Sequence, residues 1–407
     1  MRRVVFSLLA GLVLAGSGAP AFAADPWQVP TDAGLATGDP DSFAWAMFVA
    51  LTWPADQASR LPASDRPYGD PGPVMFETWA LSDQVYLSKG AEPPVWDEVD
   101  WSASRALNTR SLPRQIAMFR DVSSVKAGNV SDEQEEVWLN RATFDYIRDN
   151  SLYSVEGQQW FFYNNRPISF PPGAIQVQAV WRPIGEEDKA RYQWEEFRDA
   201  KSKRRYLYGL TALHIASKVL PHWLWATFEH VDNPYRPGLY DEGWLNRSRD
   251  SAACPAAQLD CNRVPTGFGL EGTRWANYRL RGTQIDYVDA DGHPVILANS
   301  ELETGFQQSS SCMSCHKRST IGPSRNEAAS FVFNADNKTH EPASPTAMRL
   351  PVFKIDSEGR VTSYNGVPQP GEFLLPGQAE GGSERFLSLD FVWSLIDAES
   401  VSAGGKK

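Results

Sequence analysis

The amino-acid sequence predicts an α+β protein, in which a β-rich body follows N-terminal helices and precedes a helical C-terminal segment. Apolar residues recur at helical spacing over Phe43–Trp53, where we expect the first helix. Apolar and polar residues alternate over Ile175–Trp181, which is typical of a half-buried strand. From about Asn299 onward the spacing becomes helical again. These three stretches set the expected order of the fold.

The N-terminal part contains two expected helices with a loop between them. Five prolines and two glycines between residues 54 and 73 predict that the helix over Phe43–Trp53 ends in this loop. The second helix is expected from about Ser131 to Asn150, because Ser131 and Gln134 have the spacing of a capping box.

Strand patterns dominate the middle of the chain. The segments 204–216 and 223–231 are rich in aromatic and β-branched residues, which favour strands. The dipeptide Asp291-Gly292 has the composition of a hairpin turn. We therefore expect strands over 175–181, 204–216, 223–231, 275–280 and 283–288. A short helix capped by Asp390 is expected to end the fold, over Asp390–Ala398.

Composition and charge exclude two broad classes of protein. The chain has 407 residues, of which 42% are hydrophobic and 12% aromatic, so it can bury a core that a disordered chain could not. This length is typical of two or three domains or of one large domain. The formal net charge is −11, whereas a surface that binds nucleic-acid phosphates needs a basic excess. We therefore expect no nucleic-acid partner.

Residues 1–23 have the three parts of a secretory signal peptide. Arg2 and Arg3 form a basic start, Val4–Ala15 is a short apolar run, and Ala21-Phe22-Ala23 is a cleavage site of the A-x-A type. Because neither this run nor any later one is long enough to cross a bilayer, we expect an exported protein without a membrane span. It would lie in the periplasm or be secreted, with a β-rich body over 24–298 and a further segment over 299–407.

The strongest chemical signal is the run Cys312-Met313-Ser314-Cys315-His316, which is the C-x-x-C-H pattern of covalent haem attachment. Two thiols at this spacing can add to the two vinyl groups on one edge of a porphyrin. The adjacent imidazole of His316 can then reach the iron as its proximal ligand. Export agrees with this chemistry, because covalent attachment takes place on the exported side of the membrane.

Three other interpretations of this motif stay open. A thioredoxin-type dithiol would follow a strand in a βαβ pattern, whereas a polar loop precedes Cys312. A structural zinc site would need a second ligand pair, and the seven-residue spacing of Cys254 and Cys261 does not suit one. A disulfide framework alone would leave His316 without a role.

The stretch Ser310–His316 resembles the attachment site of c-type cytochromes. The segments 43–54, 225–234 and 390–394 resemble parts of large exported bacterial monohaem proteins of the c-type cytochrome family. This resemblance implies one covalent haem c, attached through Cys312 and Cys315. It also implies that residues 299–407 form a cytochrome c-like haem-binding segment.

The remaining two cysteines, Cys254 and Cys261, flank a short polar insert between expected strands. In an oxidising compartment we expect them to form a disulfide. Such a short loop would contribute roughly 2–3 kcal/mol to stability.

The sixth coordination position of the iron decides between classes of function. Met348, which lies 32 residues after His316, is the expected distal ligand, and a core methionine is the alternative. The aromatic strands carry further candidates for distal ligation or proton transfer, each of which has a structural alternative. These candidates are His214, His222, Glu229 and His230.

Two functions follow as hypotheses. The first is a periplasmic c-type cytochrome that passes single electrons to a redox partner protein. The second is a haem-dependent oxidoreductase, a peroxidase or an oxygenase, whose small-molecule substrate would bind in a pocket of the β-rich body. A closed iron coordination sphere would favour the first hypothesis, and an open one would favour the second.

Overall fold

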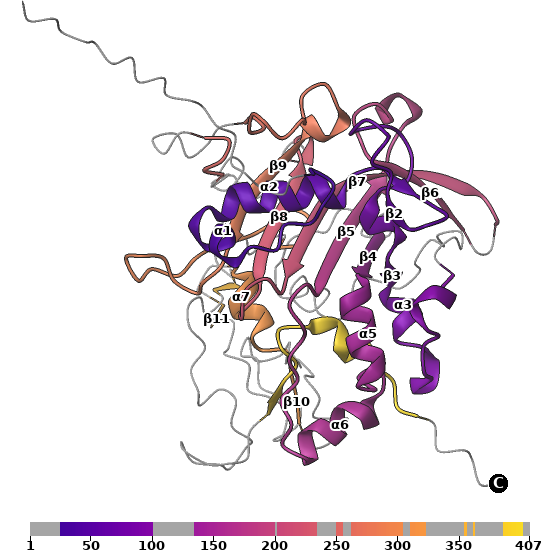
Figure 1. Cartoon of the computed structure of the whole chain (residues 1–407), viewed down its shortest axis with the longest axis vertical. Coiled ribbons are helices and arrows are strands. Elements are labelled where there is room, and N and C mark those ends of the chain that lie inside the picture. Colours follow the sequence, from indigo (N-terminus) through magenta and orange to yellow (C-terminus); the bar gives the residue numbers. More distant parts are fainter. Residues whose placement is uncertain are drawn as a thin grey trace, which may run out of the picture.

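The computed structural model describes residues 25–100, 134–199, 202–233, 250–254, 262–303, 310–322 and 386–401, together with two short strands between 354 and 362. A seven-stranded antiparallel sheet forms its centre (Figure 1). The strand order is β3-β4-β5-β7-β8-β9, and β6 pairs with the beginning of β7. The strands are β3 Ala80–Leu81, β4 Gln134–Leu139, β5 Ile175–Pro183, β6 Trp194–Arg198, β7 Arg205–Ser217, β8 Leu224–His230 and β9 Tyr278–Gln284.

One face of the sheet is apolar and lies under helix α2, Pro40–Leu51. Strand register places Leu213 beside Phe228, and Phe228 beside Leu280, on this face. Phe48 of α2 packs on Phe228 with ring centroids 4.4 Å apart, and Figure 1 shows α2 crossing β8. The helix starts three residues before the expected Phe43, because Pro40 fits the first turn and the Asp39 carboxylate accepts a hydrogen bond from Ser42 N at 3.2 Å.

The opposite face of the sheet is polar. Because side chains alternate between faces, the register that turns Leu213 toward α2 turns its neighbour His214 the other way. His214 pairs with Gln178 on β5 and with Thr227 on β8, and Glu229 lies on the same side. Predicted strands 175–181, 204–216 and 223–231 are thus confirmed, and β7 and β8 together carry this face.

The helix predicted over Ser131–Asn150 is wrong in its first part. Residues 134–139 form strand β4, which pairs with β3 on one side and β5 on the other. The helix, α5, covers only Arg141–Asp149, because the Asn140 side chain caps it by accepting a hydrogen bond from Thr143 N at 3.0 Å. Sheet pairing therefore overrides the helical spacing of the first residues.

The expected helical, cytochrome c-like C-terminal segment is also wrong as a fold assignment. In the described part of this segment the only α-helix is α7, Cys312–His316. The other described elements of this segment are short antiparallel strand pairs and a 3-10 helix, Trp393–Asp397, because these described stretches pair with one another as strands. The strand pairs are β10 Thr320–Ile321 with β13 Leu387–Ser388, and β11 Lys354–Ile355 with β12 Val361–Thr362.

Two smaller expectations are corrected as well. The strands predicted over 275–280 and 283–288 form one strand, β9, preceded by a 3-10 turn at Arg274–Asn277. Asp390 does not cap a helix, because the 3-10 helix starts two residues after Phe391 and no side chain caps it.

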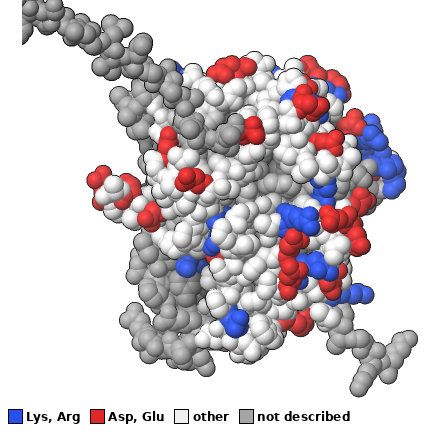
Figure 2. Space-filling model, viewed as in Figure 1, with Lys and Arg blue, Asp and Glu red and all other residues white. Residues whose placement is uncertain are grey.

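The other described elements are short and surround the sheet. The helices are α1 Ala33–Gly38, α3 Ser82–Val85 and α6 Val155–Tyr163, and a two-stranded ribbon joins β1 Ala55–Asp56 to β2 Leu61–Pro62. Further 3-10 turns cover Met75–Thr78, Ser88–Gly90, Trp96–Glu98 and Glu186–Asp188. Among the described helices, none has the length and apolar character needed to cross a bilayer. Figure 2 shows acidic and basic side chains interspersed on the face in view, beside a broad uncharged area.

Candidate functional site

Helix α7 carries the C-x-x-C-H motif and begins at the edge of the sheet where β9 ends. The side chain of Ser311 caps it, accepting a hydrogen bond from Ser314 N at 3.3 Å. Gln284, the last residue of β9, accepts from Met313 N at 3.0 Å and donates to the Ser311 hydroxyl at 2.9 Å. Because Gln284 is almost completely buried, these bonds anchor the start of the motif to the sheet.

Among the described residues, only one of the two ring nitrogens of His316 has a hydrogen-bond partner. Its Nδ1 lies 2.8 Å from the Phe391 carbonyl oxygen, which can only accept a hydrogen bond, so Nδ1 carries the proton. Nε2 makes no hydrogen bond with any residue that the structure describes. Burial lowers the pKa of His316 to about 4, which keeps the ring neutral. A neutral imidazole with a free Nε2 is the form that binds a metal.

The indole of Trp225 packs against this imidazole, with ring centroids 4.3 Å apart. Trp225 lies at the start of β8 on the polar face of the sheet. Contact with the indole therefore fixes the plane of the His316 ring from the side of the sheet.

Both cysteines of the motif are free thiols. Burial is the main cause that raises the pKa of Cys315 to about 11 and that of Cys312 well above its ordinary value. A nucleophilic dithiol needs a lowered pKa, because the thiolate is the attacking species. These surroundings therefore do not favour a thioredoxin-type redox pair.

The motif does not have the geometry of a single-ion metal site either. Within the described ranges, one group of histidine, cysteine and carboxylate side chains has ligand atoms within 4.8 Å of one another, namely Asp289, Asp291 and His293. Cys312, Cys315 and His316 form no such group, although tetrahedral zinc needs its ligands to converge. Haem c would not require this convergence, because the two cysteines and the histidine would bind different parts of the group.

A buried imidazole and a buried carboxyl group lie beside the motif. Nε2 of His214 is inaccessible, lacks a hydrogen-bond partner among the described residues and lies 3.8 Å from Glu303 Oε2. Burial, with a smaller effect from His316, lowers the pKa of His214 to about 3. Burial likewise raises the pKa of Glu303 to about 8, so the carboxyl group tends to stay protonated at neutral pH. The two groups therefore face each other in largely uncharged forms.

Glu229 has a structural place on the same face of the sheet. Its Oε1 lies 2.7 Å from Arg281 Nε, and its Oε2 accepts a hydrogen bond from Ser300 N at 3.0 Å. Glu229 therefore connects β8 to Arg281 on β9 and to Ser300, which precedes the motif in the chain. This is a structural role.

The other two histidine candidates lie in different surroundings. His222 is exposed and lies beside the rings of Tyr287 and Phe391, with centroids 5.7 Å away in each case. His230 lies at the far end of β8 from Trp225 and so is not part of the site around α7. The structure does not bring His230 to the motif, because the length of β8 separates it from Trp225.

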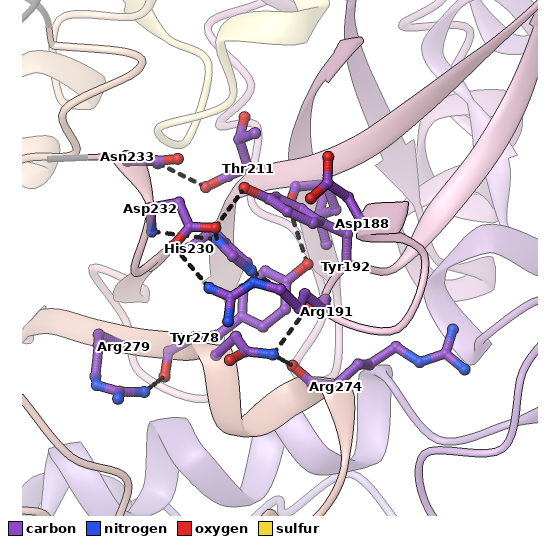
Figure 3. Close-up of polar contacts among 12 residues, drawn as sticks. Asp188, Arg191, Tyr192, Thr211, His230, Asp232, Asn233, Arg274, Tyr278 and Arg279 are labelled. Atoms are coloured by element: carbon purple, nitrogen blue, oxygen red, sulfur yellow. Dashed lines mark hydrogen bonds and ion pairs between the residues drawn. The ribbon is translucent and has the colours of Figure 1, made fainter. Parts of the chain in front are cut away.

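His230 belongs to a separate polar cluster (Figure 3). Its ring stacks on Tyr192 with centroids 3.7 Å apart. Its Nε2 lies 3.2 Å from the Arg191 carbonyl oxygen, and its Nδ1 accepts a hydrogen bond from Asp232 N at 3.2 Å. With both ring nitrogens occupied, His230 is a structural histidine.

The remaining expected site residues are only partly covered by the structure. Cys254 is disulfide-bonded, and its expected partner Cys261 lies outside the described residues. Met348, the expected distal ligand, also lies outside them. Sequence reasoning missed Phe391 and Gln284, because their contacts with the motif are made across long stretches of chain without a local pattern. It also missed Glu303, which lies beside His214.

We compared the chain with known proteins. No protein-family model, no curated protein and no solved structure matches this chain. The site is therefore interpreted from its own geometry.

Proposed function

We propose that this protein is an exported c-type cytochrome, located in the periplasm or secreted, that holds one haem c covalently and passes electrons to a redox partner protein. The observation that carries this proposal is the state of His316. Its Nδ1 is bonded to the Phe391 carbonyl, and its Nε2 is left available directly beside two free thiols. Cys312 and Cys315 would form the thioether bonds, and His316 would be the proximal ligand.

The surrounding residues support this assignment by what they do to the ligand. The Phe391 carbonyl makes the imidazole more basic and selects the tautomer with a free Nε2. Gln284 and Ser311 hold the helix start that carries the first cysteine. When bound, haem supplies a reversible one-electron couple, and the residues around the motif would help set its potential.

The test is whether haem stays attached to the denatured chain. The protein is produced with its leader in a host that attaches haem c, and the gel after denaturation is stained for haem. We expect a stained band that acid-acetone extraction does not remove, and no band for the double variant Cys312→Ala/Cys315→Ala. The matched control is Cys254→Ala/Cys261→Ala, which should keep the stain. Haem that extracts freely from the unmodified protein would overturn the proposal.

Met348 remains our proposed distal ligand. Methionine ligation of ferric haem gives a weak long-wavelength charge-transfer band that a bis-histidine site lacks, and Met348→Ala should abolish it. If the unmodified protein has no such band and binds carbon monoxide readily, then the distal position is open and Met348 is not a ligand.

A haem oxidoreductase acting on a small molecule is the second candidate, because His214 and Glu303 form a buried imidazole–carboxyl pair beside the motif. Such a pair can move a proton during the reduction of peroxide or oxygen. One cavity among the described residues, of about 510 Å³, is not lined by any motif residue. Its lining residues are Tyr146, Asn150, Trp160, Phe161, Arg166 and Pro167. Fast peroxide consumption by the haem-loaded protein, lost in Glu303→Gln, would favour the enzyme.

A further inference from the structure

The chain that presents its carbonyl to His316 has an uncommon backbone conformation. Asp390 and Phe391 are consecutive non-glycine residues with φ values of 52° and 70°, in the left-handed region. Such residues persist only where their surroundings hold them in place. The contacts of Asp390 and Phe391 therefore indicate which interactions hold this backbone conformation in place.

The Asp390 side chain is fixed by two contacts with the body. Its Oδ1 lies 2.7 Å from Nζ of Lys218, a residue in the turn between β7 and β8. Its Oδ2 accepts a hydrogen bond from Phe170 N at 2.7 Å. Both charged side chains are at least nine-tenths buried, so each depends on the other for compensation of its charge.

The Lys218 ammonium group is held on its other side as well. It donates a hydrogen bond to the Pro221 carbonyl at 2.8 Å and lies 5.6 Å from the ring centroid of Trp223. The ion pair thus ties Asp390 to the turn from which β8 and Trp225 begin.

The chain next to Asp390 is tied to the motif itself. Leu389 N donates to the Ser319 carbonyl at 2.9 Å, and Ser388 pairs with Thr320. One residue after Asp390, the Phe391 carbonyl accepts the hydrogen bond from His316 Nδ1. The ion pair, the left-handed backbone and the imidazole form one continuous series of contacts.

We propose that the buried Lys218–Asp390 ion pair is a positioning device for the proximal ligand: it maintains the backbone conformation that aims the Phe391 carbonyl at His316 Nδ1. This inference rests on the proposed haem-binding function and adds to it the residues that set the strength of the ligand. Removing the pair weakens the hydrogen bond to Nδ1. The imidazole then becomes a weaker donor to ferric iron, and the midpoint potential rises.

The experiment uses the full haem-loaded chain and compares Asp390→Asn with the matched control Asp232→Asn. Both variants remove one carboxylate charge that is paired with a cation, but Asp232 belongs to the cluster around His230. Asp390→Asn should raise the midpoint potential and accelerate hydrogen exchange of His316 Nδ1–H roughly two- to tenfold, the range expected for one lost hydrogen bond. Asp232→Asn should leave both quantities unchanged.

A second variant guards against misfolding. Lys218→Met/Asp390→Leu replaces the pair by apolar side chains, a change that buried ion pairs often tolerate. It should raise the potential in the same direction. If either Asp390 variant folds, keeps its covalent haem and shows an unchanged potential and unchanged Nδ1–H exchange, then the ion pair is only structural and this inference is wrong. Loss of covalent haem from the unmodified protein would instead overturn the proposed function, and the positioning role with it.

Discussion

A buried histidine, His230, and a half-buried one, His316, lie near opposite ends of β8, and their surroundings differ in one decisive respect. His230 has a partner on each ring nitrogen and stacks on Tyr192 at 3.7 Å. Within the described part of the chain, His316 has a hydrogen-bond partner on Nδ1 alone, and it packs on Trp225 at 4.3 Å. Both rings lie against aromatic side chains, so aromatic contact does not distinguish them. The free Nε2 does.

This difference is the one that the proposed haem ligation by His316 requires. A fold that uses histidine for packing satisfies both nitrogens, because an unpaired buried nitrogen costs free energy. A fold that uses histidine as a ligand satisfies one nitrogen and keeps the other available. The nearby carboxyl groups differ too. Burial raises the pKa of Glu303 to about 8, whereas at Asp232 burial is outweighed by hydrogen bonds from Arg191 and Tyr192 and by the charge of Arg191, so the pKa of Asp232 is lowered.

The largest expected effect is at His316. His316→Ala should abolish the absorption spectrum of imidazole-ligated haem, because no other group of the motif can take the proximal position. The spectrum of the reduced protein measures this. His230→Ala should keep the normal spectrum. A His230 variant that also lost the spectrum would remove the distinction between the two histidines.

The second effect is on stability, and we expect it at His230. His230→Ala removes a fully buried ring and takes the hydrogen-bond acceptor away from Asp232 N, which should lower the free energy of unfolding by about 2–4 kcal/mol, although the Arg191 carbonyl keeps its hydrogen bond from Asn277. Urea unfolding followed by tryptophan fluorescence measures the change. The control is the exposed His293→Ala, which should cost less than about 0.5 kcal/mol. An equally small loss at His230 would contradict a structural role.

The third effect is a pH dependence that separates the two carboxyl groups. Glu303 keeps its proton in the folded state up to a pH of about 8, whereas the unfolded state releases it near 4.5. The folded state therefore binds more protons across this window, and stability from this group falls as pH rises, by at most about 1.4 kcal/mol per pH unit.

Glu303→Gln should remove this slope, so the variant gains stability relative to the unmodified protein between pH 5 and pH 8. Subtracting the two unfolding free energies cancels the titration of His214. Asp232→Asn should show the opposite sign, because a lowered pKa stabilises above the ordinary value and that stability is lost in acid. Identical pH profiles for Glu303→Gln and the unmodified protein would contradict the buried, protonated carboxyl group.

The smallest effect concerns one hydroxyl group of the His230 cluster. Tyr192→Phe keeps the stacked ring but removes the hydrogen bond from the Tyr192 hydroxyl to Asp232 Oδ2, which is 3.1 Å long. Unfolding should become easier by about 0.5–1 kcal/mol, with no change in the haem spectrum. A loss as large as that of His230→Ala would show that the hydroxyl, and not the stack, holds the cluster together.

Local patterns in the sequence were sufficient for the elements that pack in regular layers. The spacing over 43–53 predicts α2, and the alternation over 175–181 predicts β5, because burial of one face repeats with the period of the element. The motif and its cap are local too, since Ser311 lies next to Cys312 and the capping bond spans three residues. The local sequence therefore predicts the chemistry of the motif without any tertiary contact.

The rest depended on contacts across the chain. Residues 134–139 have helical spacing, yet they become a strand because β3 and β5 provide backbone partners on both sides. His316 and Phe391 are 75 residues apart, and no pattern in either segment predicts the hydrogen bond between them. The sequence alone determined which side chains can carry the chemistry. Only the tertiary structure decided which ring nitrogen is free, because a hydrogen-bond partner is chosen by position in space and not by distance along the chain.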